Sequence, residues 1–263
     1  GLNLDRFSFQ SPSDNPPPTV MPHIMIEQKI ISKIEENIKS IEIFLSKKEI
    51  YKLEFPTEWT FYFIMERYLI NLKTIRKLLP NLKNDGLYEI PIGLIIRTSI
   101  LDSLTSLDIF CLTADGDEME EKIQNILLDN VFITINYFND LHQYGEIETN
   151  DLRKAKENME EGLKILLEKI GKKDINELIK EKKNFKINTP KSIFDKLMAS
   201  KYRNFGKCYD YYNYYSKFEH FGVLYPMLSR QKYEEKIDLI ENSLKYIFLI
   251  IEILMSEENK YEA

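Results

Sequence analysis

Glycine is scarce in this sequence, with nine residues among 263. Chains rich in β-structure need glycine in many tight turns, and nucleotide-binding loops are lined with it. No stretch alternates apolar and polar residues over more than a few positions, and no Asn-Gly or Gly-Gly pair marks a hairpin turn. The sequence therefore predicts an all-α fold without a glycine-lined nucleotide site.

Cysteine and histidine are also rare, with two and three residues. Cys111 and Cys208 lack the paired spacing of a zinc site or a redox motif, so both are expected to be reduced core residues. A di-iron bundle needs two Glu-x-x-His pairs, and neither His142 nor His220 has a glutamate three positions earlier. Zinc-protease and Walker A motifs are absent too. We expect no metal and no cofactor.

Long apolar runs and an excess of positive charge are missing as well. The longest uninterrupted apolar run is residues 246–251, whereas a membrane span needs about twenty largely uncharged residues. The net charge of −6 argues against a dedicated nucleic-acid binder, because Lys and Arg supply most of the affinity for phosphates. No signal-peptide pattern opens the sequence. We expect a cytoplasmic protein that does not contact a membrane.

The sequence divides into a short proline-rich segment and one long helical region. Residues 1–22 contain SPSDNPPPTVMP, whose prolines prevent a helix, so a loose tail or a surface strap is expected. Residues 23–263 show no internal repeat and no flexible linker, which favours a single domain. Steps of three and four between apolar residues predict helices over 23–49, 57–79, 91–112, 118–143, 151–170, 190–200, 204–221 and 229–256. Thr57, Thr189 before Pro190, and Ser229 are expected to cap three of these helices. We expect a bundle of long antiparallel helices.

Lysine and glutamate dominate residues 169–186. Asp174 and Glu177 can cap a short helix there. Because both charge signs are interleaved, we expect a solvated face that projects from the body rather than a nucleic-acid site.

Aromatic residues crowd the stretch YDYYNYYSKFEHFG, residues 209–222. Tyr212, Ser216 and His220 fall four residues apart and share one helix face. A helix so rich in aromatics is expected at the centre of the fold, where its polar groups need partners. These groups form either an internal hydrogen-bond network or a pocket in which His220 binds a ligand or moves a proton. A Ser216–His220 nucleophile pair is disfavoured, since nothing local supplies an oxyanion hole.

A second polar set lies in IIRTSILDSLTSLD, residues 95–108. Arg97 and Asp102 are separated by about 140° around a helix, so they do not pair directly and each is expected to meet a different neighbour. An arginine at the edge of an apolar stripe either pairs with an acid on another helix or holds an anion. The structural ion pair is the favoured interpretation of Arg97.

The combination of IGLIIRTSILDS with a later Tyr-x-x-x-Ser-x-x-x-His run resembles an uncharacterised bacterial family of helical proteins. Arg97 matches that family's arginine, Asp102 stands where the family has a glutamate, and Tyr212, Ser216 and His220 match its second helix. Such proteins are similar to the HEPN superfamily of helical bundles, which includes RNA-cleaving toxins. The resemblance implies ribonuclease chemistry in which Arg97 stabilises charge and His220 moves the proton. The short arginine-to-histidine spacing of those ribonucleases is missing here.

We therefore expect a non-enzymatic or weakly catalytic module that binds a small polar or anionic ligand, or a protein partner, near Arg97 and His220. Asp102, Tyr212 and Ser216 complete this expected ligand site. Two alternatives stay open: a divergent HEPN-like ribonuclease of a defence or stress system, acting on RNA, and a non-catalytic scaffold bundle. The apolar stripes of the first and last long helices either form a homodimer or are buried internally.

Overall fold

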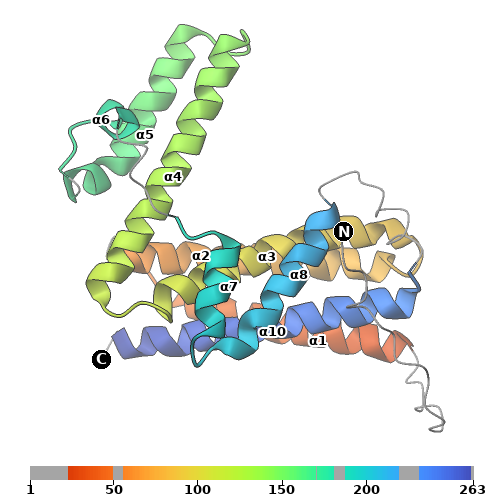
Figure 1. The fold of residues 1–263 in the computed structure, drawn as a ribbon. Coiled ribbons are helices and arrows are strands. Elements are labelled where there is room, and N and C mark those ends of the chain that lie inside the picture. Colours follow the sequence, from red (N-terminus) through yellow and green to blue (C-terminus); the bar gives the residue numbers. More distant parts are fainter. Residues whose placement is uncertain (1–22, 50–55, 170, 181–186, 219–230, 262–263) are drawn as a thin grey trace, which may run out of the picture.

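The computed structural model describes residues 23–49, 56–169, 171–180, 187–218 and 231–261. Every regular element in these ranges is helical, which confirms the predicted all-α bundle (Figure 1). The α-helices are α1 (His23–Ser46), α2 (Thr57–Leu78), α3 (Glu89–Phe110), α4 (Gly116–Gln143), α5 (Thr149–Lys169), α6 (Ile175–Lys180), α7 (Pro190–Met198), α8 (Lys207–Tyr215) and α10 (Tyr233–Tyr261). Short 3₁₀ turns are η3 (Leu79–Asn81), η4 (Gly86–Tyr88), η6 (Arg203–Gly206) and η7 (Ser216–Phe218). The predicted tail, residues 1–22, lies outside the described residues.

Helix α3 lies at the centre of the bundle, in contact with α2, α4, α7, α8 and α10. The segment Gly86–Phe110 is long and apolar enough to cross a membrane, but half of its most apolar window is buried among the other helices, as is typical of a core helix. The aromatic helix was expected in this central place, and that expectation is wrong. Helix α8 lies against the side of α3, and only Cys208 and Tyr215 among its residues are buried. Gly93 of α3 has no side chain, so the rings of Tyr215 and Phe218 pack directly against its backbone.

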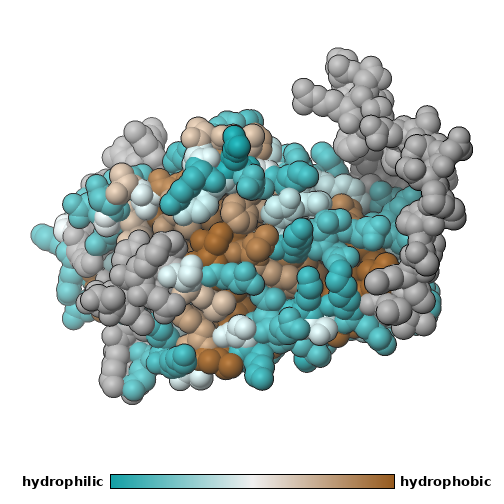
Figure 2. Space-filling model, turned by 90° about the horizontal axis from the view of Figure 1, so that it is seen from below, coloured by the Kyte–Doolittle hydropathy of each residue, from teal (hydrophilic) through white to brown (hydrophobic). Residues whose placement is uncertain are grey.

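Helices α1, α2 and α10 complete the bundle: α1 packs on α2 and α10, and both of these pack on α3. The apolar stripes of α1 and α10 face this core, through Ile30, Ile34, Ile38, Ile41, Ile240, Leu244, Ile247 and Ile251. Figure 2 views the molecule from the side of α1 and α10, where hydrophobic side chains show between hydrophilic ones. A homodimer through this face stays a prediction.

Helices α4 and α5 form a hairpin that projects from the bundle (Figure 1). Contacts of α4 with α2 and α3 hold its base, and α6 packs on α5. Val131, Ile135 and Ile175 form a small separate core within it. The carboxylate of Asp174 accepts a 2.9 Å hydrogen bond from the Glu177 backbone at the start of α6, as predicted. The projecting arm is longer than expected, because it includes α4 and α5 as well as α6.

Helix ends follow local capping chemistry. The side chains of Asp115 and Thr189 accept backbone hydrogen bonds from the first turns of α4 and α7. The prediction of Thr57 as the cap of α2 is wrong: Thr57 is the first helical residue, and Pro56 before it makes no side-chain cap bond. Ser229, the predicted cap of the last helix, lies outside the described residues.

Candidate functional site

The polar side chains of α3 contact partners on the neighbouring helices α2, α4, α7, α8 and α10. Their contacts are Glu89 with Lys236 on α10, Arg97 with Tyr212 on α8, Asp102 with Arg67 on α2, Ser99 with Asn71 and Ser103 with Tyr68 on α2, and Asp108 with Lys122 on α4 and Lys196 on α7. Arg97 and Asp102 therefore do meet different neighbours, as their angular separation predicts. The five residues of the predicted site do not form one cluster, since Asp102 faces α2 and Arg97 faces α8.

Arg97 and Tyr212 join α3 to α8. Arg97 Nη2 donates a hydrogen bond of 3.2 Å to the Tyr212 hydroxyl, and the guanidinium carbon lies 4.9 Å from the ring centre. Tyr212 stacks near-parallel on Tyr209 at 6.3 Å, and Tyr209 stacks on Phe194 of α7 at 4.9 Å. A cation over an aromatic face contributes about 0.5–1 kcal/mol at exposed sites and more when desolvated. These contacts, from Arg97 through Tyr212 and Tyr209 to Phe194, connect α7 and α8 to the central helix α3.

The other two residues of the predicted aromatic face have different outcomes. Ser216 Oγ donates a 2.7 Å hydrogen bond to the Asn213 carbonyl, within its own chain segment. Ser216 also begins the 3₁₀ turn η7, where each residue turns by about 120° instead of 100°, so the predicted four-residue face is not continued. His220 lies outside the described residues. Its proximity to Arg97 stays a prediction.

Asp102 and Arg67 form an ion pair on the other side of α3. Asp102 Oδ1 lies 3.1 Å from Arg67 Nη2, and 12% of the Asp102 side chain is exposed against 57% of Arg67. Burial raises the pKa of Asp102 to about 6, and the nearby Arg67 charge opposes this shift. The second carboxylate oxygen, Oδ2, is buried and accepts no hydrogen bond within the described part of the chain. A buried carboxylate that is only half satisfied is costly, and such groups concentrate at functional sites.

Beside this pair lies a cavity of about 310 Å³, where the α4–α5 hairpin joins the bundle; we call it the hairpin cavity. Its apolar wall includes Trp59, Phe63, Ile109, Ile126, Leu127 and Leu163, from α2, α3, α4 and α5. Its polar lining comprises Thr60, Arg67, Asp102, Thr105 and Asn130. A mostly apolar wall with a few polar groups is typical of small-molecule sites, which range from about 300 to 1,000 Å³.

Sequence reasoning selected Asp102 but missed Arg67 and the hairpin cavity. Arg67 is one of several charged residues on an amphipathic helix, and nothing in its spacing distinguishes it. Gly162 carried a usable signal, because a glycine inside a helical pattern costs stability and often has a packing or functional reason. A Cβ atom added to Gly162, which lines the cavity, would meet nothing within 4 Å.

An ion pair in which both side chains are buried lies at the start of α3. Lys236 Nζ is 2.7 Å from Glu89 Oε2, and each side chain is 4% exposed. The Tyr214 hydroxyl oxygen lies 2.9 Å from Gln231 Oε1 and 3.4 Å from Glu89 Oε1, so its single proton can be donated to either acceptor. Burial raises the pKa of Glu89, while Lys236 opposes this shift. The close pairing indicates a structural link between α3, α8 and α10.

Asp108 connects the end of α3 to three other parts of the chain. It accepts hydrogen bonds from Lys122 at 3.4 Å, from Lys196 at 3.3 Å and from Asn188 at 2.6 Å. These contacts come from α4, α7 and the segment before α7. Asp108 therefore helps to hold the base of the hairpin against the bundle.

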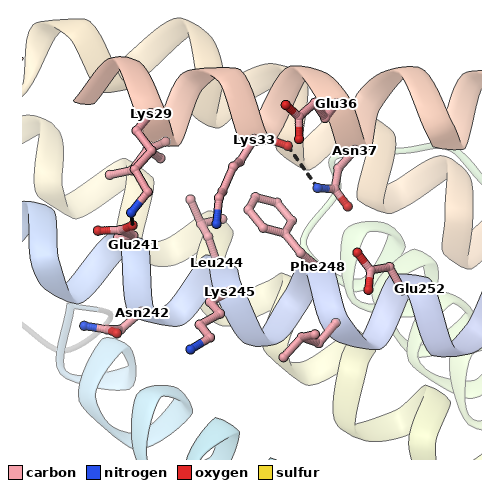
Figure 3. Close-up of a pocket in the computed structure, with 12 residues that line it drawn as sticks. Lys29, Lys33, Glu36, Asn37, Glu241, Asn242, Leu244, Lys245, Phe248 and Glu252 are labelled. Carbon is pink, nitrogen blue, oxygen red and sulfur yellow. Dashed lines mark hydrogen bonds and ion pairs between the residues drawn. The ribbon is translucent and has the colours of Figure 1, made fainter. Parts of the chain in front are cut away.

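A larger groove of about 470 Å³ runs between α1 and α10 (Figure 3). Lys29 pairs with Glu241 at 2.9 Å across it, and Asn37 donates to the Lys33 carbonyl. Three lysines and three glutamates line it, so the lining carries no net charge. Its chemistry indicates a ligand class less clearly than that of the hairpin cavity, despite its greater size.

In the described ranges, no group of three or more His, Cys, Asp or Glu residues is placed to hold a metal ion.

No family model matches the sequence, and neither curated proteins nor solved structures show significant similarity to it.

Proposed function

We propose that the protein is a helical module that binds a small, largely apolar molecule with a polar head in the hairpin cavity. The observation that carries this proposal is the Arg67–Asp102 pair at the edge of an apolar cavity. Burying a carboxylate with one unsatisfied oxygen costs free energy of folding. A binding role supplies a reason for this cost.

The position of the hairpin cavity supports the same proposal. It lies between the bundle and a projecting arm, and ligand sites are common between helices and between substructures. Trp59 and Phe63 pack edge to face at 5.5 Å and offer a broad apolar surface. Phe63 is 42% exposed, so part of its ring is accessible beside the cavity.

This proposal moves the predicted ligand site from the Arg97 side of α3 to the Asp102 side. The expectation of a small ligand is retained, and so is Asp102 as a site residue. The ribonuclease alternative depends on Arg97 and His220 sharing a solvent-accessible cleft, so it stays a prediction. A scaffold role is the outcome that remains if the hairpin cavity binds nothing.

Gly162 offers a direct test. Gly162→Leu adds a bulky side chain at a residue that lines the hairpin cavity, where an added Cβ atom meets nothing within 4 Å. Gly162→Ala is its matched control, because both replace a helical glycine by a better helix former. The probe is N-phenyl-1-naphthylamine, a neutral apolar fluorophore. We expect wild type and Gly162→Ala to bind it alike, and Gly162→Leu to bind it about tenfold more weakly or not at all. Equal binding by both variants, or none by the wild type, overturns the proposal.

A further inference from the structure

We infer that the hairpin cavity selects an amphipathic anion, and that Asp102 takes up a proton when this anion binds. The head of the ligand lies against Arg67, and an acyl or aryl tail lies along the apolar wall. This inference rests on the proposed function and adds the chemical class of the ligand and its coupling to pH.

The charges that line the hairpin cavity favour a negative head. Among the described lining residues, Arg67 and Asp102 are the two that carry charge. The guanidinium is 57% exposed, whereas Asp102 is 12% exposed and its Oδ2 is buried. Asp102 Oδ1 engages Arg67 Nη2, and a guanidinium has five N–H donors in a planar fork. The charge accessible to a ligand is therefore positive, and its geometry suits a carboxylate, sulfonate or phosphate.

The remainder of the lining favours an uncharged, extended tail. Ile126 and Leu127 come from α4, and Leu163 comes from α5. These residues face the α2 and α3 side of the cavity, where Ile109 is buried. Thr60, Thr105 and Asn130 supply neutral hydrogen-bonding groups. A second charge on the tail would find no opposite partner in this lining.

An anion at Arg67 competes directly with Asp102. When Asp102 is ionised, it neutralises Arg67 and repels an incoming negative head. When Asp102 is protonated, that repulsion disappears and the positive charge of Arg67 is free for the ligand. The remaining groups around Asp102 leave this balance unchanged: Tyr68 of α2 is neutral, and the lining residues of α4 and α5 carry no charge.

The burial of Asp102 allows it to be protonated within the pH range in which binding can be measured. Burial raises its pKa to about 6, so a modest fall in pH supplies the proton from solvent. A ligand that binds only the protonated form gains affinity as the pH falls, with an upper limit of about tenfold per pH unit. Affinity then levels off once Asp102 is protonated in the free protein.

The test uses displacement of N-phenyl-1-naphthylamine by three eight-carbon probes: octane-1-sulfonate, octan-1-ol and octylammonium. Sulfonate stays ionised across the pH range, so any pH dependence belongs to the protein. We expect octane-1-sulfonate to bind most tightly at pH 5, where Asp102 is largely protonated, and to weaken several-fold by pH 8, whereas octan-1-ol binds equally at both. Asp102→Asn should bind the sulfonate as tightly at pH 8 as the wild type does at pH 5. Arg67→Gln should bind it no better than the alcohol.

Failure of the inference is separable from failure of the proposed function. If sulfonate and alcohol bind equally at every pH while Gly162→Leu still binds neither, the preference for an anion is rejected. The hairpin cavity then remains a binding site. Tightest binding of octylammonium assigns the site to cations and also overturns the inference. A preference for sulfonate that persists unchanged with pH in both the wild type and Asp102→Asn rejects the proton coupling.

Discussion

Asp102 and Arg67 are partners of very unequal burial: their charged atoms lie 3.1 Å apart, yet 12% of one side chain is exposed and 57% of the other. The acid bears the desolvation cost, while the base keeps much of its hydration. Disturbing the pair therefore has consequences that depend on which partner is changed.

Asp102→Asn should remove a pH dependence of stability. Burial raises the pKa of Asp102 to about 6, so the folded protein binds this proton more tightly than the unfolded chain, whose aspartates titrate near about 4. The contribution of Asp102 to the free energy of unfolding is therefore most favourable below about pH 4 and is lost as the pH rises through about 6. At pH 7.5 the variant should be more stable than the wild type by up to about 3 kcal/mol. Urea unfolding at pH 4.5 and 7.5 measures the difference, and parallel behaviour of the two proteins would contradict it.

Gly93→Ala should destabilise the protein, although alanine is the better helix former. A Cβ atom at Gly93 would lie 2.5 Å from the Phe218 ring and 2.6 Å from the Tyr215 ring. Overpacking of this kind costs about 1–3 kcal/mol, which exceeds the gain in helix propensity of about 1 kcal/mol. Gly162→Ala is the matched control, since its Cβ meets open space and should stabilise the helix. Relative to the wild type, the unfolding temperature of Gly93→Ala should fall and that of Gly162→Ala should rise. An unfolding temperature of Gly93→Ala at or above that of the wild type would refute this packing.

Glu89 and Lys236 should show strong coupling in a double-mutant cycle. Either single change, Glu89→Gln or Lys236→Met, leaves one member of a buried pair without its counter-charge, at a cost of about 3–5 kcal/mol. The double variant leaves no isolated charge, so its loss should be well below the sum of the two single losses. Urea unfolding at pH 7 gives the three values. Additive losses would show that the two side chains do not interact as described.

Tyr212→Phe and Tyr212→Leu should separate the two contacts of Arg97. Phenylalanine keeps the ring beneath the guanidinium and loses the 3.2 Å hydrogen bond, at a cost of about 0.5–1.5 kcal/mol. Leucine removes the ring as well, and with it the stack on Tyr209, so its loss should be clearly larger. Thermal unfolding measures both. Equal losses of stability in the two variants would mean that the Tyr212 ring itself contributes nothing to the stability of the fold.

The helices were largely predictable from the sequence because their signals are local. Periodic apolar residues located α1 to α5, and the Thr189-Pro190 and Asp174 caps located the starts of α7 and α6. The central position of α3 was not predictable in the same way. The central position depends on how many other helices pack against one helix, which the sequence of that helix does not encode. The aromatic content of α8 therefore led to the wrong central helix.

The candidate site was only half predictable for a related reason. Asp102 was identifiable as a polar residue on an apolar helix, but its partner Arg67 lies 35 positions away on another amphipathic helix. The hairpin cavity requires α2, α3, α4 and α5 to meet, and no spacing within one helix encodes that meeting. The 3₁₀ turn at Ser216 likewise interrupts a face that ideal helical geometry would have continued.

The most direct test of the central claim is a crystal structure with octane-1-sulfonate carrying bromine at its far end. The bromine gives an anomalous signal that locates the tail without ambiguity. The account predicts one bromine peak within the hairpin cavity, near Leu127 and Leu163, with the sulfonate against the Arg67 guanidinium. Bromine in the groove between α1 and α10, or at any place outside the hairpin cavity, would contradict it.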